Sequence, residues 1–126
     1  MMLRAFAGDA RGASAVEFAI TAPIFCMLLV GIVEGGMLLW AQIGLQHGTQ
    51  MAARCATIDT SVCGSADQIQ SYAAQQSYGL NPPSSTFSFS AAACGNQVSA
   101  SYRFALISNY FGMPALQIRA QSCFPT

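Results

Sequence analysis

Residues 12–33 read GASAVEFAITAPIFCMLLVGIV, and this stretch decides the fold. No charged residue occurs from Phe18 to Val33, and the apolar composition resumes after Glu34 and continues to Leu45. About 20 apolar residues in a helix suffice to cross a bilayer, so a membrane-spanning helix is expected here. Glu17 stands at the start of the apolar run, where an unpaired carboxylate is costly in lipid. This carboxylate therefore needs a positive partner, a proton or contact with the membrane surface.

One long helix is predicted from Ala13 to about Arg54. At 1.5 Å per residue it measures roughly 60 Å, which is longer than a bilayer is thick. The first half is therefore expected in the membrane, and the second half must pack on another part of the chain. Pro23 removes one backbone hydrogen bond from the helix, so a bend is expected near Ala19.

The arginines on either side of the apolar run indicate its orientation. Arg4 and Arg11 precede it, and the next arginine is Arg54. This distribution favours a cytoplasmic N-terminus and an exported C-terminal domain. A cleaved secretory signal and an uncleaved single-pass anchor are the alternatives. The early Pro23 and the apolar pattern beyond Trp40 argue against the cleaved signal.

Two stripes of small residues occur at helical spacing. Gly31 and Gly35 fall at membrane depth, and we expect them to pack against other long helices. The second stripe is expected to face the chain's own domain. Its members are Ala41, Gly44, Gly48 and Ala52. Glu34 marks the outer membrane boundary, which is the favoured interpretation, or forms an ion pair with another subunit.

The residues after the helix predict a small domain over residues 55–126. The sequence from Ser65 to Gln68 has the form of a capping box, so a short helix is expected from about Ala66 to Ser77. Beyond Pro82 and Pro83 the apolar residues alternate with period two, which predicts a three-stranded antiparallel sheet. The expected strands cover residues 87–91, 98–104 and 116–120. The fold class is therefore α+β, with the sheet lying on the second half of the long helix.

The five cysteines divide between the apolar run and the domain. Cys26 lies in the run and is expected to be a small buried hydrophobic residue. The other four can form two disulfides in an oxidising compartment, with three possible connectivities. We favour Cys55 with Cys63, which closes a short loop, and Cys94 with Cys123, which joins neighbouring strands. A zinc site is disfavoured because no Cys-x-x-Cys pair occurs.

Few residues could carry catalysis or bind nucleic acid. Only 8% of residues are charged and the net charge is zero, so no basic surface for nucleic acid is expected. His47 is the single histidine, and a membrane-tethered hydrolase that uses it is the least favoured function. No metal, cofactor or phosphate-binding motif occurs, and no enzyme activity is expected. Tyr110 and Phe111 either contact a partner or, as we favour, cap the domain's own core.

The segment around Gly12 resembles a known processing site. Type IV pilin-like precursors are cut after a glycine by a membrane aspartyl peptidase, which leaves glutamate at the fifth mature position. Gly12 and Glu17 have this spacing, and Phe18 follows. With Arg11, Pro23 and the later cysteines, the chain is similar to the TadE-like minor pilins or pseudopilins of tight-adherence (Tad/Flp) pilus systems.

This resemblance implies a pilin-like fold and a role in pilus assembly. Residues 1–12 would be a leader, a prepilin peptidase would cut the bond between Gly12 and Ala13, and residues 13–54 would form the long helix. Glu17, followed by Phe18, would serve assembly by pairing with the amine of a mature N-terminus, and that of an adjacent subunit is the favoured partner. Pro23, Gly31 and Gly35 would serve helix packing.

The resemblance also implies partners and a location. The partners are the prepilin peptidase, the major Flp pilin and other minor pilins, the inner-membrane assembly platform and the lipid bilayer. The location is the bacterial inner membrane with the C-terminal domain in the periplasm, or the extracellular pilus. The alternative function is an uncleaved single-pass membrane adaptor whose exported domain binds a partner.

Overall fold

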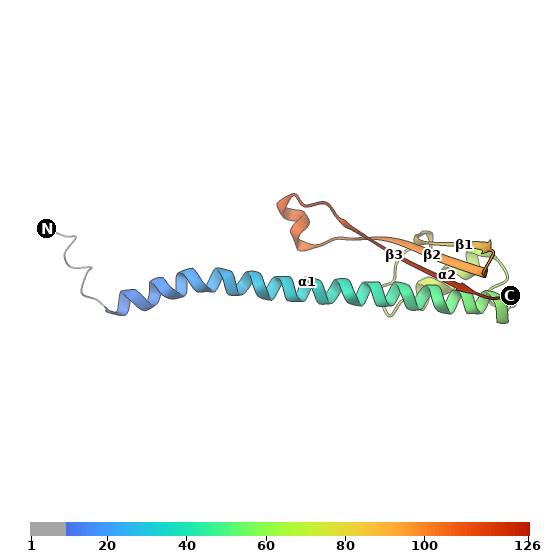
Figure 1. The fold of residues 1–126 in the computed structure, drawn as a ribbon, viewed down its shortest axis with the longest axis horizontal. Coiled ribbons are helices and arrows are strands. Elements are labelled where there is room, and N and C mark those ends of the chain that lie inside the picture. Colours follow the sequence, from blue (N-terminus) through green and yellow to red (C-terminus); the bar gives the residue numbers. More distant parts are fainter. Residues whose placement is uncertain (1–9) are drawn as a thin grey trace. The chain divides into compact units, whose positions relative to one another are not determined.

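A computed structural model describes residues 10–126 of the chain (Figure 1). Its longest element is helix α1, Ala10–Ile58, which passes through Pro23 without interruption. The helix therefore begins before Ala13 and ends beyond Arg54, the limits predicted from the sequence. Residues 1–9 of the predicted leader lie outside the described residues.

The chain divides into two compact units, with Gly35 the last residue of the first and Gly36 the first residue of the second. Among the described residues, the first unit consists of the N-terminal half of α1. The second unit contains the rest of α1 and all the other elements. This junction lies before the predicted domain boundary at Cys55, because the second half of α1 supplies core residues to the domain.

A short helix, α2, Ala66–Gln75, follows α1. The hydroxyl of Ser65 accepts a hydrogen bond from the backbone N–H of Gln68 at 3.3 Å, and the Gln68 side chain accepts one from the backbone N–H of Ser65 at 3.2 Å. The predicted capping box is therefore present. The helix ends before Ser77, which lies buried in the turn that follows.

Three antiparallel strands form one sheet in the order β1-β2-β3. They are β1, Phe87–Ala92, β2, Gly95–Phe104, and β3, Leu116–Phe124. Short 3-10 turns, η2, Ser84–Thr86, and η3, Ile107–Phe111, precede β1 and β3. The predicted α+β fold with a three-stranded antiparallel sheet is confirmed.

The core of the second unit is a single cluster to which α1, α2 and the sheet all contribute. Alternate residues of the strands enter it, so that Val98 and Ala100 are buried while Ser101 is exposed. The buried apolar residues are Ala41, Leu45, Ala52, Ala53, Cys63, Ile69, Ala73, Phe87, Val98, Ala100, Phe104, Ile118 and Ala120. Small residues dominate the α1 contribution, which lets its backbone approach the rest of the domain closely.

The second small-residue stripe faces the domain, as predicted. A Cβ added at Gly44 would lie 2.8 Å from the carbonyl oxygen of Ser77, and one at Gly48 would lie 2.6 Å from that of Ala73. Because Cβ atoms do not approach other atoms this closely, only glycine fits at either position. These two glycines bring the backbone of α1 against the C-terminal end of α2.

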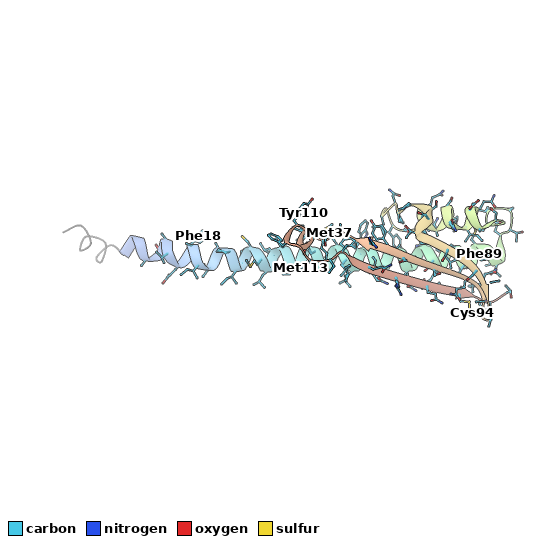
Figure 2. All side chains as sticks on the ribbon, turned by 90° about the horizontal axis from the view of Figure 1, so that it is seen from above. Phe18, Met37, Phe89, Cys94, Tyr110 and Met113 are labelled. Atoms are coloured by element: carbon cyan, nitrogen blue, oxygen red, sulfur yellow. A yellow bond between two sulfur atoms is a disulfide. The ribbon has the colours of Figure 1, made fainter. Side chains whose placement is uncertain are left out.

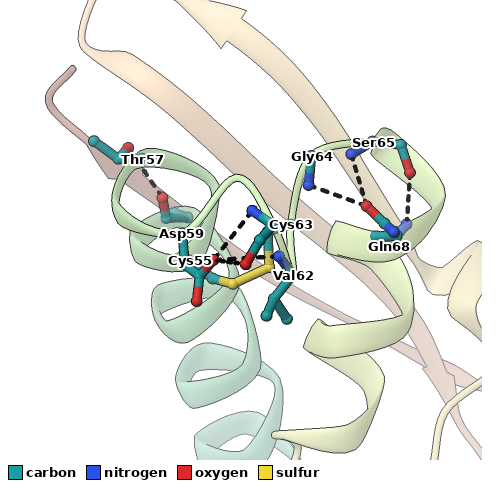
Figure 3. The surroundings of a disulfide bond; sticks show 10 residues. Cys55, Thr57, Asp59, Val62, Cys63, Gly64, Ser65 and Gln68 are labelled. Carbon is teal, nitrogen blue, oxygen red and sulfur yellow. Dashed lines mark hydrogen bonds between the residues drawn. A yellow bond between two sulfur atoms is a disulfide. The ribbon is translucent and has the colours of Figure 1, made fainter.

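Two disulfides close the second unit, with the pairing that the sequence favoured. Cys55 is bonded to Cys63, with their Cα atoms 5.8 Å apart, at the end of α1 (Figure 3). Cys94 is bonded to Cys123, with their Cα atoms 6.2 Å apart, and joins the β1–β2 turn to the end of β3. Both pairs lie within the normal range of Cα separations for disulfides.

The turn closed by the first disulfide is organised by one carboxylate. Asp59 accepts hydrogen bonds from the Ser61 hydroxyl and from the backbone N–H groups of Ser61 and Val62. The hydrogen bond from the Ser61 side chain, followed by that from Val62, lowers the pKa of Asp59 below its ordinary value. The ionised carboxylate therefore fixes the backbone between Cys55 and Cys63.

Candidate functional site

The predicted cleavage bond, between Gly12 and Ala13, lies in the first turn of α1. The first N–H groups of a helix have no acceptor within the helix, and α1 begins at Ala10. In addition, glycine is less favourable in a helix than alanine by about 1 kcal/mol. A Cβ at Gly12 would meet nothing within 4 Å. The first turn can therefore unwind at low cost and present this bond in an extended form.

Glu17 shares one face of α1 with the pair of membrane-depth glycines. Successive helical residues are rotated by about 100°, so Gly31 and Gly35 both lie within about 40° of the direction of Glu17. Ala13 falls in the same sector one turn earlier. The Thr21 hydroxyl, one turn later, donates to the carbonyl oxygen of Glu17 at 2.9 Å. Ala13, Glu17 and the two glycines thus lie along one face, whereas Pro23, the third position predicted to serve helix packing, lies about 120° away.

This face is open in the first unit. A Cβ at Gly31 or at Gly35 would have no other group within 4 Å. Two glycines one turn apart leave a shallow region in which the backbone of a second helix could come close. The open backbone at these glycines is compatible with close helix packing, which stays a prediction.

Large apolar side chains surround the first unit on all sides and are 44% to 74% exposed. Phe18, labelled in Figure 2, is among the most exposed, at 73%. The most apolar window has a mean hydropathy of 2.3, and none of it is buried. Such a helix, apolar all round, indicates a single-pass membrane protein. The set consists of Val16, Phe18, Ile20, Ile24, Phe25, Met27, Leu28, Leu29, Val30, Ile32 and Val33.

Two residues of the apolar run need separate comment. Cys26 is exposed, so the expectation that it would be buried is wrong for the isolated chain. Pro23 lies inside α1 and leaves the carbonyl of Ala19 without its usual N–H donor. The bend expected near Ala19 stays a prediction.

His47 contacts the turn that follows α2. Its Nδ1 atom lies 2.8 Å from the carbonyl oxygen of Gln76, the residue that caps the end of α2. Its ring stacks on that of Tyr78, with the ring centres 4.2 Å apart. The imidazole therefore joins α1 to the turn after α2, a role in packing rather than in a nucleophilic pair.

The loop between β2 and β3 is more exposed than the sequence interpretation favoured. We call residues 105–115 the apolar loop; it contains η3. Tyr110 is 91% exposed and Phe111 is 82% exposed, so neither caps the core as was favoured. Ile107 and Met113 are also more than half exposed. The signal available in the sequence was the absence of any charge between Arg103 and Arg119.

One comparison with known proteins gives a match, which covers about a third of the chain. Residues 12–54 match the family model of TadE-like proteins. The matched segment begins at Gly12, contains Glu17 and covers most of α1. It confirms the resemblance inferred from the sequence. No curated protein and no solved structure matches the chain.

Proposed function

Because residues 12–54 form a TadE-like segment, associated with Tad pili, we propose that the chain is a minor pilin or pseudopilin of a Tad/Flp-type pilus. In this proposal residues 1–12 are a leader, and a prepilin peptidase cuts the bond between Gly12 and Ala13. The mature chain is a structural subunit and not an enzyme. The observation that carries the proposal is the family match, which begins at Gly12 and runs along an exposed apolar helix.

The position of the cleavage bond supports processing. A peptidase needs an extended substrate, and the first turn of α1 has the fewest helical hydrogen bonds to lose. Cutting there creates an α-amino group on Ala13, one helical turn from Glu17. Both groups then lie where the apolar run begins, so each charge has a partner of opposite sign.

The arrangement of the face that carries Glu17 supports pairing between subunits. If the amine belongs to a neighbouring chain, the two helices must run close together. Gly31 and Gly35 lie on the same face and permit such an approach further along the helix. One helix–helix contact can thus join the ion pair at one end to the glycine pair at the other.

The proposed setting is the bacterial inner membrane, with the N-terminus in the cytoplasm and the domain of residues 55–126 in the periplasm or on the pilus. The partners are the prepilin peptidase, the major Flp pilin, other minor pilins and the assembly platform. An exported domain is compatible with its two disulfides, which form in oxidising compartments.

Assembly can be tested with Glu17→Gln, which removes the charge and keeps the shape of the side chain. Removing one partner of an ion pair in a low-dielectric setting costs about 3 to 5 kcal/mol, so incorporation of the chain into sheared pili should fall by a factor of roughly 150 to 5,000. Glu34→Gln is the matched control, the same chemical change in the same helix. The readout is the amount of the chain in the pilus fraction relative to the membrane fraction.

Two results separate this proposal from its rival. Loss of incorporation with Glu17→Gln, but not with Glu34→Gln, supports the pairing. Normal pili in cells that lack the chain altogether would contradict an assembly role. An uncleaved single-pass membrane adaptor would then be the better description.

A further inference from the structure

We propose that the apolar loop, residues 105–115, inserts into the headgroup region of the same bilayer that α1 crosses. The proposal rests on the membrane-spanning role of the first half of α1 and does not depend on pilus assembly. Its occupant is a lipid surface that contains anionic headgroups. The argument comes from the position, the composition and the charge of the loop within the second unit.

Hydrogen bonds between α1 and β3 fix the position of the loop. The Gln42 side chain donates to the carbonyl oxygen of Arg119 at 2.9 Å, and the Gln46 side chain donates to that of Gln121 at 3.5 Å. At the other end of the strand, the Asn96 side chain, level with Phe124, donates to Thr57 at 3.0 Å. β3 therefore runs in the same direction as α1.

This register places the start of β3 at the end of the unit where α1 enters. Leu116 precedes Arg119 by about 10 Å of strand, which equals about six or seven residues of helix. Leu116 is thus level with about Gly36, the first residue of the second unit. Figure 2 shows Tyr110 and Met113 at one end of the strands and Cys94 at the other. Since the apolar run directly precedes Gly36 in the chain, the loop lies at the end of the second unit to which the apolar run is joined.

The composition of the loop suits a lipid interface. No charged side chain occurs from Phe104 to Ile118. Tyr110 and Phe111 present almost their whole side chains to solvent, and Met113 presents 57% of its own. Aromatic rings with this exposure are enriched at the level of the headgroups. Trp40, the single tryptophan, is 44% exposed in the part of α1 that follows the junction, where such a belt is expected.

Charge favours anionic lipid over another protein as the occupant. Arg103 and Arg119 flank the loop, and both are exposed on the sheet. No Asp or Glu side chain follows Asp67 in the sequence, so nothing acidic on the strands or the loop offsets these two arginines. A loop with an apolar tip and arginines on both sides can bind a membrane. Its apolar side chains insert into the bilayer, and its arginines contact the phosphate groups of the lipids.

Fluorescence of a single tryptophan tests the insertion in the full chain reconstituted into vesicles. Trp40→Phe removes the natural tryptophan, and Tyr110→Trp places the probe at the tip of the loop. Ala92→Trp in the same background is the control, because position 92 lies beside the β1–β2 turn, about 30 Å along β2 from the loop. The vesicles are phosphatidylcholine with brominated acyl chains, with or without phosphatidylglycerol.

The expected result is strong quenching and a blue-shifted emission for Tyr110→Trp, with the Ala92→Trp probe remaining as in water. Removing one arginine, in Arg103→Gln or Arg119→Gln, should lower the ratio of inserted to free loop about fivefold in anionic vesicles and leave it unchanged in zwitterionic ones. Equal quenching of the two probes would overturn the proposal. A blue shift that grows with the protein-to-lipid ratio, without bromine quenching, would assign the loop to contact between copies and also overturn it. No pilus component is present, so failure here is independent of failure in assembly.

Discussion

Single residues control how closely α1 approaches α2. The backbone of α1 at Gly48 lies against the buried hydroxyl of Ser77, which itself donates to the carbonyl oxygen of Ala73 at 2.8 Å. Thr49, also fully buried, is satisfied by the carbonyl of Gln46 at 2.9 Å. The buried hydroxyl groups at this contact thus have hydrogen-bond partners, and the contact leaves no space for an added methyl group.

Gly48→Ala should destabilise the second unit. The new Cβ would lie 2.5 Å from the Ser77 Oγ atom and 2.6 Å from the carbonyl oxygen of Ala73, and overpacking of this kind costs about 1 to 3 kcal/mol. Thermal unfolding of the full chain in detergent micelles, followed by near-ultraviolet circular dichroism, measures the loss.

Gly36→Ala is the matched control in the same helix and the same unit. Nothing lies within 4 Å of a Cβ at this position, so the higher helix propensity of alanine should leave stability unchanged or raise it by up to about 1 kcal/mol. Equal effects at Gly36 and Gly48 would contradict the tight contact with α2.

At the level of the secondary-structure elements, the two disulfides stabilise the second unit to different extents. Cys94 and Cys123 are separated by 29 residues and Cys55 and Cys63 by 8. In the chain-entropy description the longer loop gives the larger effect, by about 1 kcal/mol. Replacing both members of the longer pair by serine should therefore lower the free energy of unfolding by about 1 kcal/mol more than the same change in the shorter pair. Denaturant titration of the two double variants measures this difference, and the reverse order would contradict it.

The turn after α1 should respond to acid through Asp59. Because the folded-state pKa of Asp59 is lowered, ionised Asp59 stabilises the fold above its ordinary value of 3.8, and this contribution disappears as pH falls through the lowered value. The difference in melting temperature between wild type and Asp59→Asn should be constant near neutral pH and vanish in acid. The other carboxylates are present in both proteins, so their titration drops out of this difference. A difference that persists in strong acid would contradict this role of the charge.

For the whole molecule, periodicity predicted most of the architecture. The charge-free run after Glu17 indicated the apolar helix, and the period of two indicated the three strands. The capping box at Ser65 and the orientation of Gly44 and Gly48 towards the domain followed from spacing alone. These features depend on local hydrogen bonding and on which face of an element is apolar, both of which are visible in a sequence.

Other features depend on contacts that spacing does not encode. Whether Tyr110 and Phe111 fold back on the core depends on the path of the loop between two strands, and the structure turns them outward. Cys26 was expected to be buried, but it lies on an apolar helix whose surface suits lipid or other helices, and in the isolated chain it is exposed. The environment of His47 depends on Gln76 and Tyr78, which belong to a turn after another helix.

Cleavage after Gly12 is the central claim of this account, and peptide mapping of the N-terminus tests it most directly. The measurement is the intact mass and the N-terminal peptide of the full chain from its native membrane, for wild type and Gly12→Ala, with and without the prepilin peptidase. The account predicts a chain that begins at Ala13 only when the peptidase is present and position 12 is glycine. A wild-type chain that still begins at Met1 in the presence of the peptidase would contradict it.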